Sequence, residues 1–399
     1  MKPDLRPITP DLLPAYQQAD ARGFAANLDR PIDDPWSNLE LDRAVGAFDA
    51  DEVVGIGRNY SLELTAPGGT LLPAAGVSWI TVLPTHRRTG ILRSMMDHLL
   101  LDACDHEEAA LILTASEGGI YGRFGYGVAT QVLGIELERR RIAWRAPAPG
   151  RVRLVSPEEA SAIAPVVFDQ VRRTRAGVVS RPDDWWEGEW WDTRDSAPRF
   201  DVVFEGESGP EGFALYGVDG GWSEGETTKT LFVRDFVAAT PEAAAGLWQY
   251  LGHVDLIRTI KAANVPIDTP LPWLLTDSRA MRVTSRRDFL WLRPIDVCVL
   301  LGARSYAIDG RLVLEVVDDG PAGGRYELDG GPDGATCSRT GAEPHLVLGA
   351  DALGMIALGG IRPSVLGRAG WIHAPEAGAA TFADVMLSAD QEPTALTWF

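Results

Sequence analysis

Two adjacent arginines and a glycine lie in a short turn whose chemistry suits an anion. Arg87, Arg88 and Gly90 follow the segment 77–82, which is β-branched and aromatic with period-two alternation and is therefore predicted to be a strand. After the turn, residues 91–101 carry apolar side chains at helical spacing. A helix N-terminus presents unpaired N–H groups and a partial positive charge, and guanidinium groups pair with phosphate oxygens. We therefore expect this turn to hold a pyrophosphate.

The strand, the R-R-x-G-x-L turn and the helix together resemble motif A of the GNAT superfamily of acyl-coenzyme A transferases. The usual form of that motif is [RQ]-x-x-G-x-[GA], and Arg87, Gly90 and Leu92 occupy its three positions. Leu92 replaces the small residue of the usual form, which implies a looser contact to one phosphate. The alternative interpretation is a surface strand, turn and helix with a solvated arginine pair.

A second motif follows an apolar strand at residues 111–113. Tyr121 precedes Gly125-Tyr126 by four residues, and this arrangement is similar to the Y-x-x-x-G-[FY] signature of the same superfamily. There the tyrosine hydroxyl faces the coenzyme A sulfur and can protonate the departing thiolate. Together with VLPTHRRTGIL, the segment resembles more specifically the enhanced intracellular survival (Eis) family of actinobacterial N-acetyltransferases.

This resemblance implies a co-substrate, a reaction and a set of contacts. It implies acetyl-coenzyme A as the acyl donor and direct transfer to an amine, without a metal or a covalent enzyme intermediate. The strand is expected to hold the pantetheine through its backbone, the turn to hold the pyrophosphate, and the loop after the second strand to line the cleft. The expected coenzyme contacts are Ile80, Thr81, Val82, Arg87, Arg88, Thr89, Gly90, Ile91, Leu92, Arg93, Ser116 and Glu117.

The resemblance also places acceptor-binding residues near the N-terminus. Residues 11–26 are predicted to be helical, and the candidates in and after this helix are Phe24, Asp33, Asp34 and Trp36. The alternative is that Phe24 is a core residue and that the two aspartates cap a turn. A formal net charge of −19 suits a cationic acceptor, although an acidic balance equally serves solubility.

The C-terminus Thr397-Trp398-Phe399 is apolar, and its rings gain free energy by burial. By resemblance, the α-carboxylate of Phe399 is the general base that deprotonates the acceptor amine. Burial raises the pKa of a carboxylate towards a range where it can accept that proton. The alternative is that the terminal aromatic side chain only fills space in the core.

Length and composition limit the classes of protein to consider. A chain of 399 residues with 45% hydrophobic and 23% charged residues is expected to fold into two or three globular domains. It has no apolar run near the ~20 residues of a membrane span and no apolar signal segment after Met1, so we expect a cytosolic protein. The strong negative charge argues against nucleic-acid binding. The spacing of its three cysteines and of its clustered histidines suggests neither a disulfide framework nor a metal site.

The fold class implied by the resemblance is mixed α and β, with tandem GNAT folds of which the second is degenerate, followed by a sterol-carrier-like α+β domain. The expected domains are 1–145, 146–288 and 289–399. A Pro- and Gly-rich stretch marks the first boundary, and short strands with Gly-rich turns begin near residue 290.

Several elements of the later domains are predicted from local patterns. In the second domain, a helix begins after Ser156 and another covers 241–251, with no basic turn before it. In the third, a strand is expected over 292–300 and a helix over 345–358. The resemblance further implies a homohexamer.

Two other functions stay open. The first is a transferase whose acceptor is a protein lysine or whose acyl group is longer than acetyl. From a different class, the chain is a coenzyme A-binding or lipid-binding regulator whose transferase site is vestigial.

Overall fold

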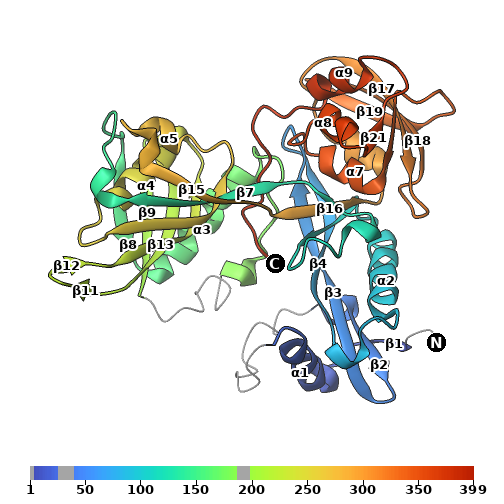
Figure 1. Cartoon of the computed structure of the whole chain (residues 1–399), viewed down its shortest axis with the longest axis horizontal. Helices are drawn as coiled ribbons and strands as arrows, with labels where there is room; N and C mark the ends of the chain where they lie inside the picture. Colours follow the sequence, from blue (N-terminus) through green and yellow to red (C-terminus); the bar gives the residue numbers. More distant parts are fainter. Residues whose placement is uncertain (1–3, 26–39, 187–197) are drawn as a thin grey trace. The chain divides into compact units, whose positions relative to one another are not determined.

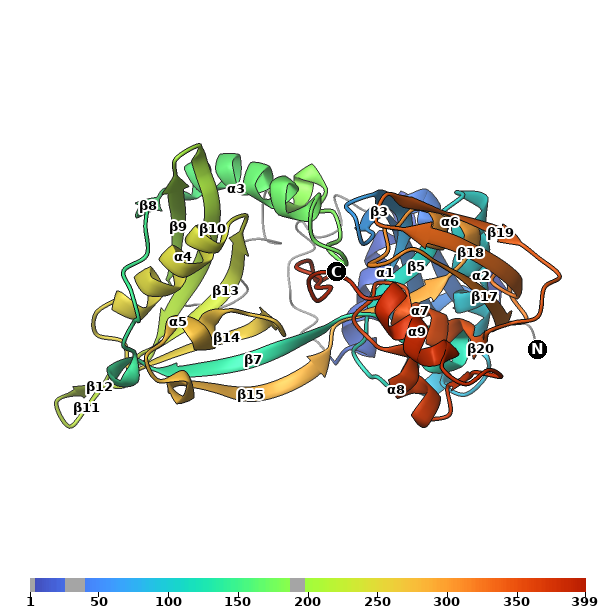
Figure 2. The same cartoon turned by 90° about the horizontal axis from the view of Figure 1, so that it is seen from above.

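The computed structural model describes residues 4–25, 40–186 and 198–399, which form two compact units. The first unit contains residues up to 130, residues 290–390 and the last three residues. The second contains residues 131–289 and 391–396. Figures 1 and 2 show both units, with the chain coloured from the N-terminus to the C-terminus. No helix within the described ranges is long and apolar enough to cross a membrane.

The first unit is built around a seven-stranded sheet. All neighbouring pairs are antiparallel except β4 and β5, which run parallel. In spatial order the strands are β1 (Asp4–Pro7), β2 (Ala44–Asp49), β3 (Glu52–Thr65), β4 (Leu71–Val82), β5 (Ala110–Thr114), β16 (Leu290–Pro294) and β6 (Gly127–Val128).

Helices α1 (Leu13–Gly23) and α2 (Ile91–Asp105) pack on this sheet. The helix predicted after the basic turn is confirmed as α2. Met95 and Leu99 of its apolar stripe are fully buried, whereas Leu92 and Leu100 are half-buried and Leu101 is exposed. Burying that stripe stabilises the helix, because the propensity of a 15-residue segment alone is marginal in water. The result is a rigid helix that begins immediately after the candidate anion-binding turn.

The sheet of the second unit repeats the plan of the first. In spatial order it contains β15 (Met281–Asp288), β7 (Gln131–Glu138), β14 (Thr259–Pro266), β13 (Thr230–Ala238), β10 (Gly209–Asp219), β9 (Arg199–Gly206) and β8 (Arg151–Val155). Again only one pair, β13 and β14, is parallel. A short hairpin joins β11 (Trp222–Ser223) and β12 (Glu226–Thr227).

Helices accompany the second sheet in the part of the unit that the structure describes (Figure 2). They are α3 (Pro157–Arg172), α4 (Pro241–His253) and the short α5 (Leu271–Leu274). The predicted cap of α3 is confirmed, because the Ser156 hydroxyl accepts a hydrogen bond of 3.2 Å from the backbone N–H of Glu159. The predicted helix at 241–251 is confirmed as α4.

The strand predicted at 292–300 is wrong in its second half. Residues 290–294 form β16, which pairs with β5 and β6 in the first sheet, and residues 297–302 form helix α6 (Val297–Gly302). Pro294 cannot continue the ladder as a donor, and the Asp296 side chain caps the helix by accepting a hydrogen bond from Val299 N at 2.9 Å. The apolar run therefore divides between a strand and a helix.

The remainder of the first unit carries a five-stranded sheet with its own core. Its strands, in spatial order, are β19 (Gly334–Arg339), β18 (Gly324–Gly331), β17 (Gly310–Val317), β20 (Leu346–Gly349) and β21 (Ile372–His373). Helices α7 (Ala350–Ile356), α8 (Pro363–Arg368) and α9 (Ala379–Met386) complete it.

The helix predicted at 345–358 is wrong at its start. Leu346 and Leu348 are buried while their neighbours are only half-buried, and the segment pairs in parallel with β17. This alternation is typical of a strand. Tertiary pairing therefore places residues 346–349 in strand β20, and the helix begins only at Ala350.

Candidate active site

The two parallel strands of the first sheet separate at the point where chemistry is expected. β4 pairs with β5 only from Ala74 to Gly76, opposite Ala110 to Ile112, and then continues alone to Val82. A bulge bends this part of β4, because two residues, Trp79 and Ile80, stand opposite the single Gly57 on β3. The edge of β4 that faces away from β3 is therefore without a β5 partner over residues 77–82.

Gly57 packs closely against the bulge. A Cβ at that position would lie 2.5 Å from Cδ1 of Ile80, so the Ile80 side chain would have to shift to accommodate it. Trp79 adopts a φ of 58°, an uncommon value for a non-glycine residue. Gly57 therefore lies opposite a bulge, at a point where β3 and β4 pack closely.

The basic turn connects the end of β4 to α2. Gly90 has a φ of 92°, in the left-handed region, and a Cβ there would meet nothing within 4 Å. Glycine is therefore favoured by the backbone angle and not by lack of space for a side chain. The first bond of α2 runs from Ser94 N to Gly90 O, at 3.1 Å. The N–H groups of residues 91–93 therefore have no acceptor within the helix.

The side chains of Arg87, Arg88 and Thr89 in the turn are exposed, but they make different contacts. Arg87 Nε donates a hydrogen bond of 3.2 Å to Val82 O, and Thr89 Oγ1 donates one of 2.7 Å to His86 O. These bonds hold the turn against the end of β4. Arg88 has a φ of 67° and is exposed. Both exposed arginines of the pair are therefore accessible to an anion.

Tyr121 is buried in a 3-10 turn that follows β5. Its ring meets that of Tyr126 edge to face, with the centroids 6.1 Å apart. Burial raises the pKa of the Tyr121 hydroxyl, and a hydrogen bond with the Ser116 side chain offsets part of this effect. The phenol is thus protonated at neutral pH and can serve as an acid. Of the predicted residues, the structure brings Ser116 and Tyr121 into direct contact.

The C-terminal residue lies at the end of β5. Phe399 is only 5% exposed, and its terminal oxygen accepts a hydrogen bond of 2.8 Å from Thr114 Oγ1. Its ring packs on Gly76 of β4, where a Cβ would be 3.1 Å from Phe399 Cε2. The backbone oxygen of Phe399 is therefore placed at the end of β5, where β4 and β5 separate. Thr114 was not among the predicted site residues, because a threonine at a strand end carries no sequence signal.

The acceptor-side candidates divide into described and undescribed residues. Phe24 is the residue after α1 and is 49% exposed, so it is not a core residue. The neighbouring Gly23 lies against Thr81 of β4, since a Cβ there would be 1.9 Å from Thr81 Oγ1. The end of α1 therefore lies beside the strand expected to hold the coenzyme. Asp33, Asp34 and Trp36 lie outside the described residues.

A buried arginine on β3 was also missed by the sequence reasoning. The Arg58 guanidinium lies 3.9 Å from the ring centroid of Tyr60 and 4.7 Å from that of Trp79, and the side chain is fully buried. Burial lowers the pKa of Arg58 to about 10. The available signal was a cationic residue directly after residues 53–57, which carry no polar side chain.

Comparison with known protein families gives matches in three regions of the chain. Residues 4–129 match an acetyltransferase (GNAT) domain, residues 177–294 match a second acetyltransferase (GNAT) domain, and residues 297–395 match a sterol carrier protein domain. The predicted fold class, tandem GNAT folds followed by a sterol-carrier-like domain, is confirmed.

Individual relatives extend over most of the chain. An uncharacterized N-acetyltransferase of Streptomyces avermitilis is 36% identical over 98% of this chain and 97% of its own length. The N-acetyltransferase Eis of Mycobacterium tuberculosis is 39% identical over 81% of this chain and 80% of its own length. The crystal structure of Eis1 from Mycobacterium abscessus superposes with a TM-score of 0.88, at 34% identity, over 99% of this chain and 100% of that one.

Proposed function

Because the chain belongs to the Eis family of GNAT N-acetyltransferases, we propose that it transfers the acetyl group of acetyl-coenzyme A directly to an amine of an aminoglycoside-like or other polyamine acceptor. The observation that carries this proposal is the burial of the Phe399 carboxylate at the end of β5, hydrogen-bonded to Thr114. A buried carboxylate beside the separated strands supplies a base in the domain that has the coenzyme turn.

The first unit offers a suitable site for the coenzyme. The bulged end of β4, at Ile80, Thr81 and Val82, has a backbone edge that can bond the amides of pantetheine. The N–H groups at the start of α2 and the exposed Arg88 would bind the pyrophosphate. Gly90 leaves open space beside that helix start, so the diphosphate can approach the backbone closely.

In the proposed reaction, the Phe399 carboxylate and the Tyr121 phenol each carry out one proton transfer. The Phe399 carboxylate takes a proton from the acceptor ammonium, which frees the nitrogen lone pair to attack the thioester carbonyl. A C–N bond forms and the C–S bond breaks, and Tyr121 gives its phenolic proton to the departing sulfur. A buried phenol with a raised pKa retains that proton until the thiolate develops.

The net charge of −19 supports a cationic acceptor, because an acidic surface raises the local concentration and the on-rate of cations. Each positive charge on a polyamine or aminoglycoside gains from this field.

The test is an acceptor panel with the purified full chain and acetyl-coenzyme A. Thiol release reports turnover, and mass spectrometry of the products reports where the acetyl group went. We expect acetylated aminoglycosides or polyamines. Acetylation confined to lysines of a protein acceptor would contradict the small-amine proposal and support a protein acyltransferase. Calorimetric binding of acetyl-coenzyme A without turnover on any amine would instead support a regulator.

The homohexamer implied by the family resemblance stays a prediction. Light scattering on the purified chain measures its molar mass directly, and a monomeric mass near 43.2 kDa would contradict a hexamer.

A further inference from the structure

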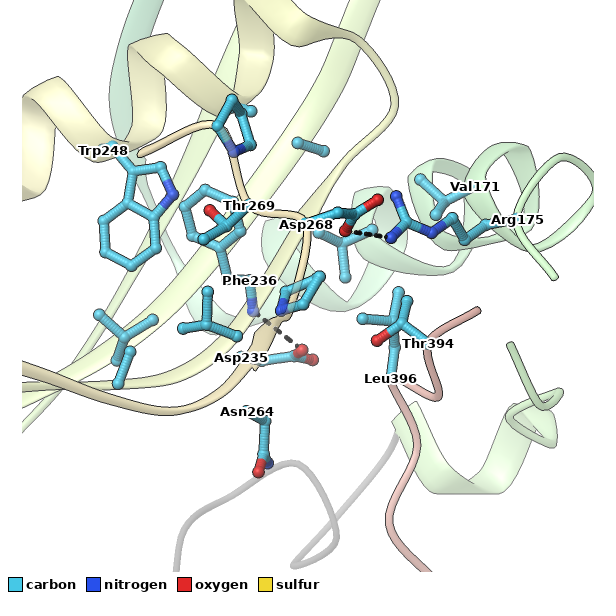
Figure 3. A pocket seen from close by; sticks show the side chains of 18 of the residues that line it. Val171, Arg175, Asp235, Phe236, Trp248, Asn264, Asp268, Thr269, Thr394 and Leu396 are labelled. Atoms are coloured by element: carbon cyan, nitrogen blue, oxygen red, sulfur yellow. Dashed lines mark hydrogen bonds and ion pairs between the residues drawn. The ribbon is translucent and has the colours of Figure 1, made fainter. Parts of the chain in front are cut away.

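The second unit contains a cavity of about 180 Å³ where its own parallel strands separate (Figure 3). β13 pairs with β14 only over residues 230–233, opposite 259–262. The cavity is lined by residues 233–238 of β13 and by Ala262, Asn264, Val265 and Pro266 of β14, at the last pair of that ladder and beyond it. It therefore occupies the place in the second sheet that corresponds to the separation of β4 and β5 in the first.

The helix that follows β13 lacks the anion-binding character of α2. Thr240 Oγ1 accepts a hydrogen bond of 3.1 Å from Ala243 N, so a side chain of the protein already satisfies the start of α4. Residues 238–240, Ala-Ala-Thr, contain no cation. A nucleotide diphosphate has no binding turn here, and the cavity suits a smaller ligand.

The wall of the cavity is largely apolar and includes two stacked aromatic rings. The Phe236 and Trp248 centroids are 4.7 Å apart, with the ring planes 24° from parallel. Both carboxylates in the wall are ion-paired at 2.6 Å, Asp268 with Arg175 and Asp235 with an arginine outside the wall. A cationic ligand would therefore find no carboxylate in the wall without an arginine partner.

One hydroxyl in the wall has no protein partner. Thr394 is 2% exposed, and its Oγ1 makes no hydrogen bond with any residue in the described part of the chain. Figure 3 shows this hydroxyl on the cavity side of the C-terminal segment. A buried hydroxyl without a partner costs free energy, and a ligand with one hydroxyl or N–H group would remove that cost.

The volume limits the ligand to about one ring. Apolar protein cavities of about 150 Å³ accommodate a benzene molecule. We propose that this cavity binds a small neutral aromatic molecule of the phenol or indole class, with its ring against Phe236 and Trp248 and its polar group bonded to Thr394. This site is separate from the acetyl-transfer site and goes beyond the proposed function.

The cavity also includes part of the C-terminal tail, residues 391–396. The backbone of this tail is bound to the second unit at three points: Arg175 Nη2 donates to Glu392 O at 2.7 Å, Thr394 N to Ala176 O at 2.9 Å, and Arg181 Nη2 to Leu396 O at 2.6 Å. Phe399 follows Leu396 by three residues. A ligand that packs on Thr394 and Leu396 would restrict the segment that leads to the proposed base. This step rests on the proposed role of Phe399.

The first experiment measures binding to the full chain by calorimetry and ligand-observed NMR, with phenol, toluene and benzoate as probes of similar size. We expect phenol to bind about fivefold more tightly than toluene, because only phenol bonds Thr394. Thr394→Val should remove this preference while leaving toluene affinity unchanged. No binding of phenol at millimolar concentration, tighter binding of benzoate than of phenol, or a preference that survives Thr394→Val would overturn the assignment.

A variant that fills the cavity, compared with a matched control, tests whether phenol binds in the cavity. Ala244 of α4 lines the cavity, whereas the adjacent Ala245 does not. We expect Ala244→Leu to weaken phenol binding at least about tenfold by occupying the space, and Ala245→Leu to leave it unchanged. Equal affinities for the two variants would place phenol elsewhere and overturn the proposal.

The coupling to the tail has its own readout. Saturating phenol should change kcat of acetyl transfer at least about twofold while the Kd of acetyl-coenzyme A stays constant, and Ala244→Leu should abolish this response. An unchanged kcat with proven binding would overturn the coupling. Deleting residues 397–399 should remove turnover but not phenol binding, so failure of the proposed function and failure of the cavity site are distinguishable.

Discussion

Thr114 Oγ1 donates a hydrogen bond of 2.8 Å to the terminal oxygen of Phe399, across 285 positions of sequence. In the proposed mechanism this oxygen belongs to the carboxylate that acts as the base, and the bond orients it. Any residue added after Phe399 converts this carboxylate into a neutral amide, while the aromatic side chain that packs on Gly76 is retained. Extending the chain therefore distinguishes the hypothesis that Phe399 supplies a base from the hypothesis that its ring only fills space.

Extending the chain by two residues after Phe399 should lower kcat by about 10²-fold or more, the range lost with a general base. The Kd of acetyl-coenzyme A should not change, since the extension does not touch the basic turn. The measurements are steady-state kinetics and calorimetry, with the same two residues added at the N-terminus as the control. Full turnover in the C-terminally extended protein would exclude the carboxylate as the base.

Thr114→Val should lower kcat about tenfold by removing the bond that orients the Phe399 carboxylate. Thr114→Ser keeps a hydroxyl at the same position and is expected to retain most of the activity. Kinetics of both variants against the same amine provide the comparison. Equal activities of the valine and serine variants would show that the hydrogen bond does not assist turnover.

Tyr121→Phe should lower kcat by about 10²-fold to 10⁴-fold while the affinity for acetyl-coenzyme A stays close to that of the unmodified protein. Burial raises the pKa of Tyr121, so the protonated, donating form persists to higher pH than for a free tyrosine. Ionisation of this residue should therefore cause no loss of kcat below about pH 10. Parallel losses of binding and turnover, or an alkaline decline well below that pH, would contradict its role as the acid.

Arg88→Gln should raise the Kd of acetyl-coenzyme A by about tenfold to 100-fold, the range of a charge-assisted hydrogen bond to phosphate. Because Arg88 is exposed, the effect should shrink as the salt concentration rises. Arg140→Gln removes another exposed arginine, in the second unit, and serves as the control in the same calorimetric titration. A similar loss of affinity in both variants would indicate a general charge effect and not a pyrophosphate contact.

Arg43→Leu should lower the free energy of unfolding by about 3–5 kcal/mol, because it leaves two carboxylates in the protein interior without their partner. Arg43 is 4% exposed and bonds both Asp102 and Glu108 at 2.7 Å. The matched control is Arg6→Leu, whose pair with Asp4 is exposed and should contribute much less to stability. Urea denaturation measures both, and equal losses would contradict the burial argument.

Sequence reasoning succeeded where interactions between neighbouring residues determine the local structure. The turn around Gly90 depends on one backbone angle, and the α3 cap depends on a hydroxyl and an N–H three residues apart. It failed where distant strands decided the outcome. Leu346 to Gly349 form a strand because they pair with β17, and no local pattern distinguished that from the first turn of a helix.

The amino-acid sequence alone determined the basic turn, the tyrosine motif and, through them, the expected family and fold class. Each of these two motifs is a short contiguous segment, residues 87–92 and 121–126, so its conformation follows from local backbone preferences and hydrogen bonds. Only the tertiary structure decided that the Phe399 carboxylate meets Thr114, that Arg43 compensates two buried acids, and that the tail closes a cavity beside β13 and β14. Those contacts join segments far apart in sequence, and they form only when burial of the whole core offsets the entropy lost in ordering them.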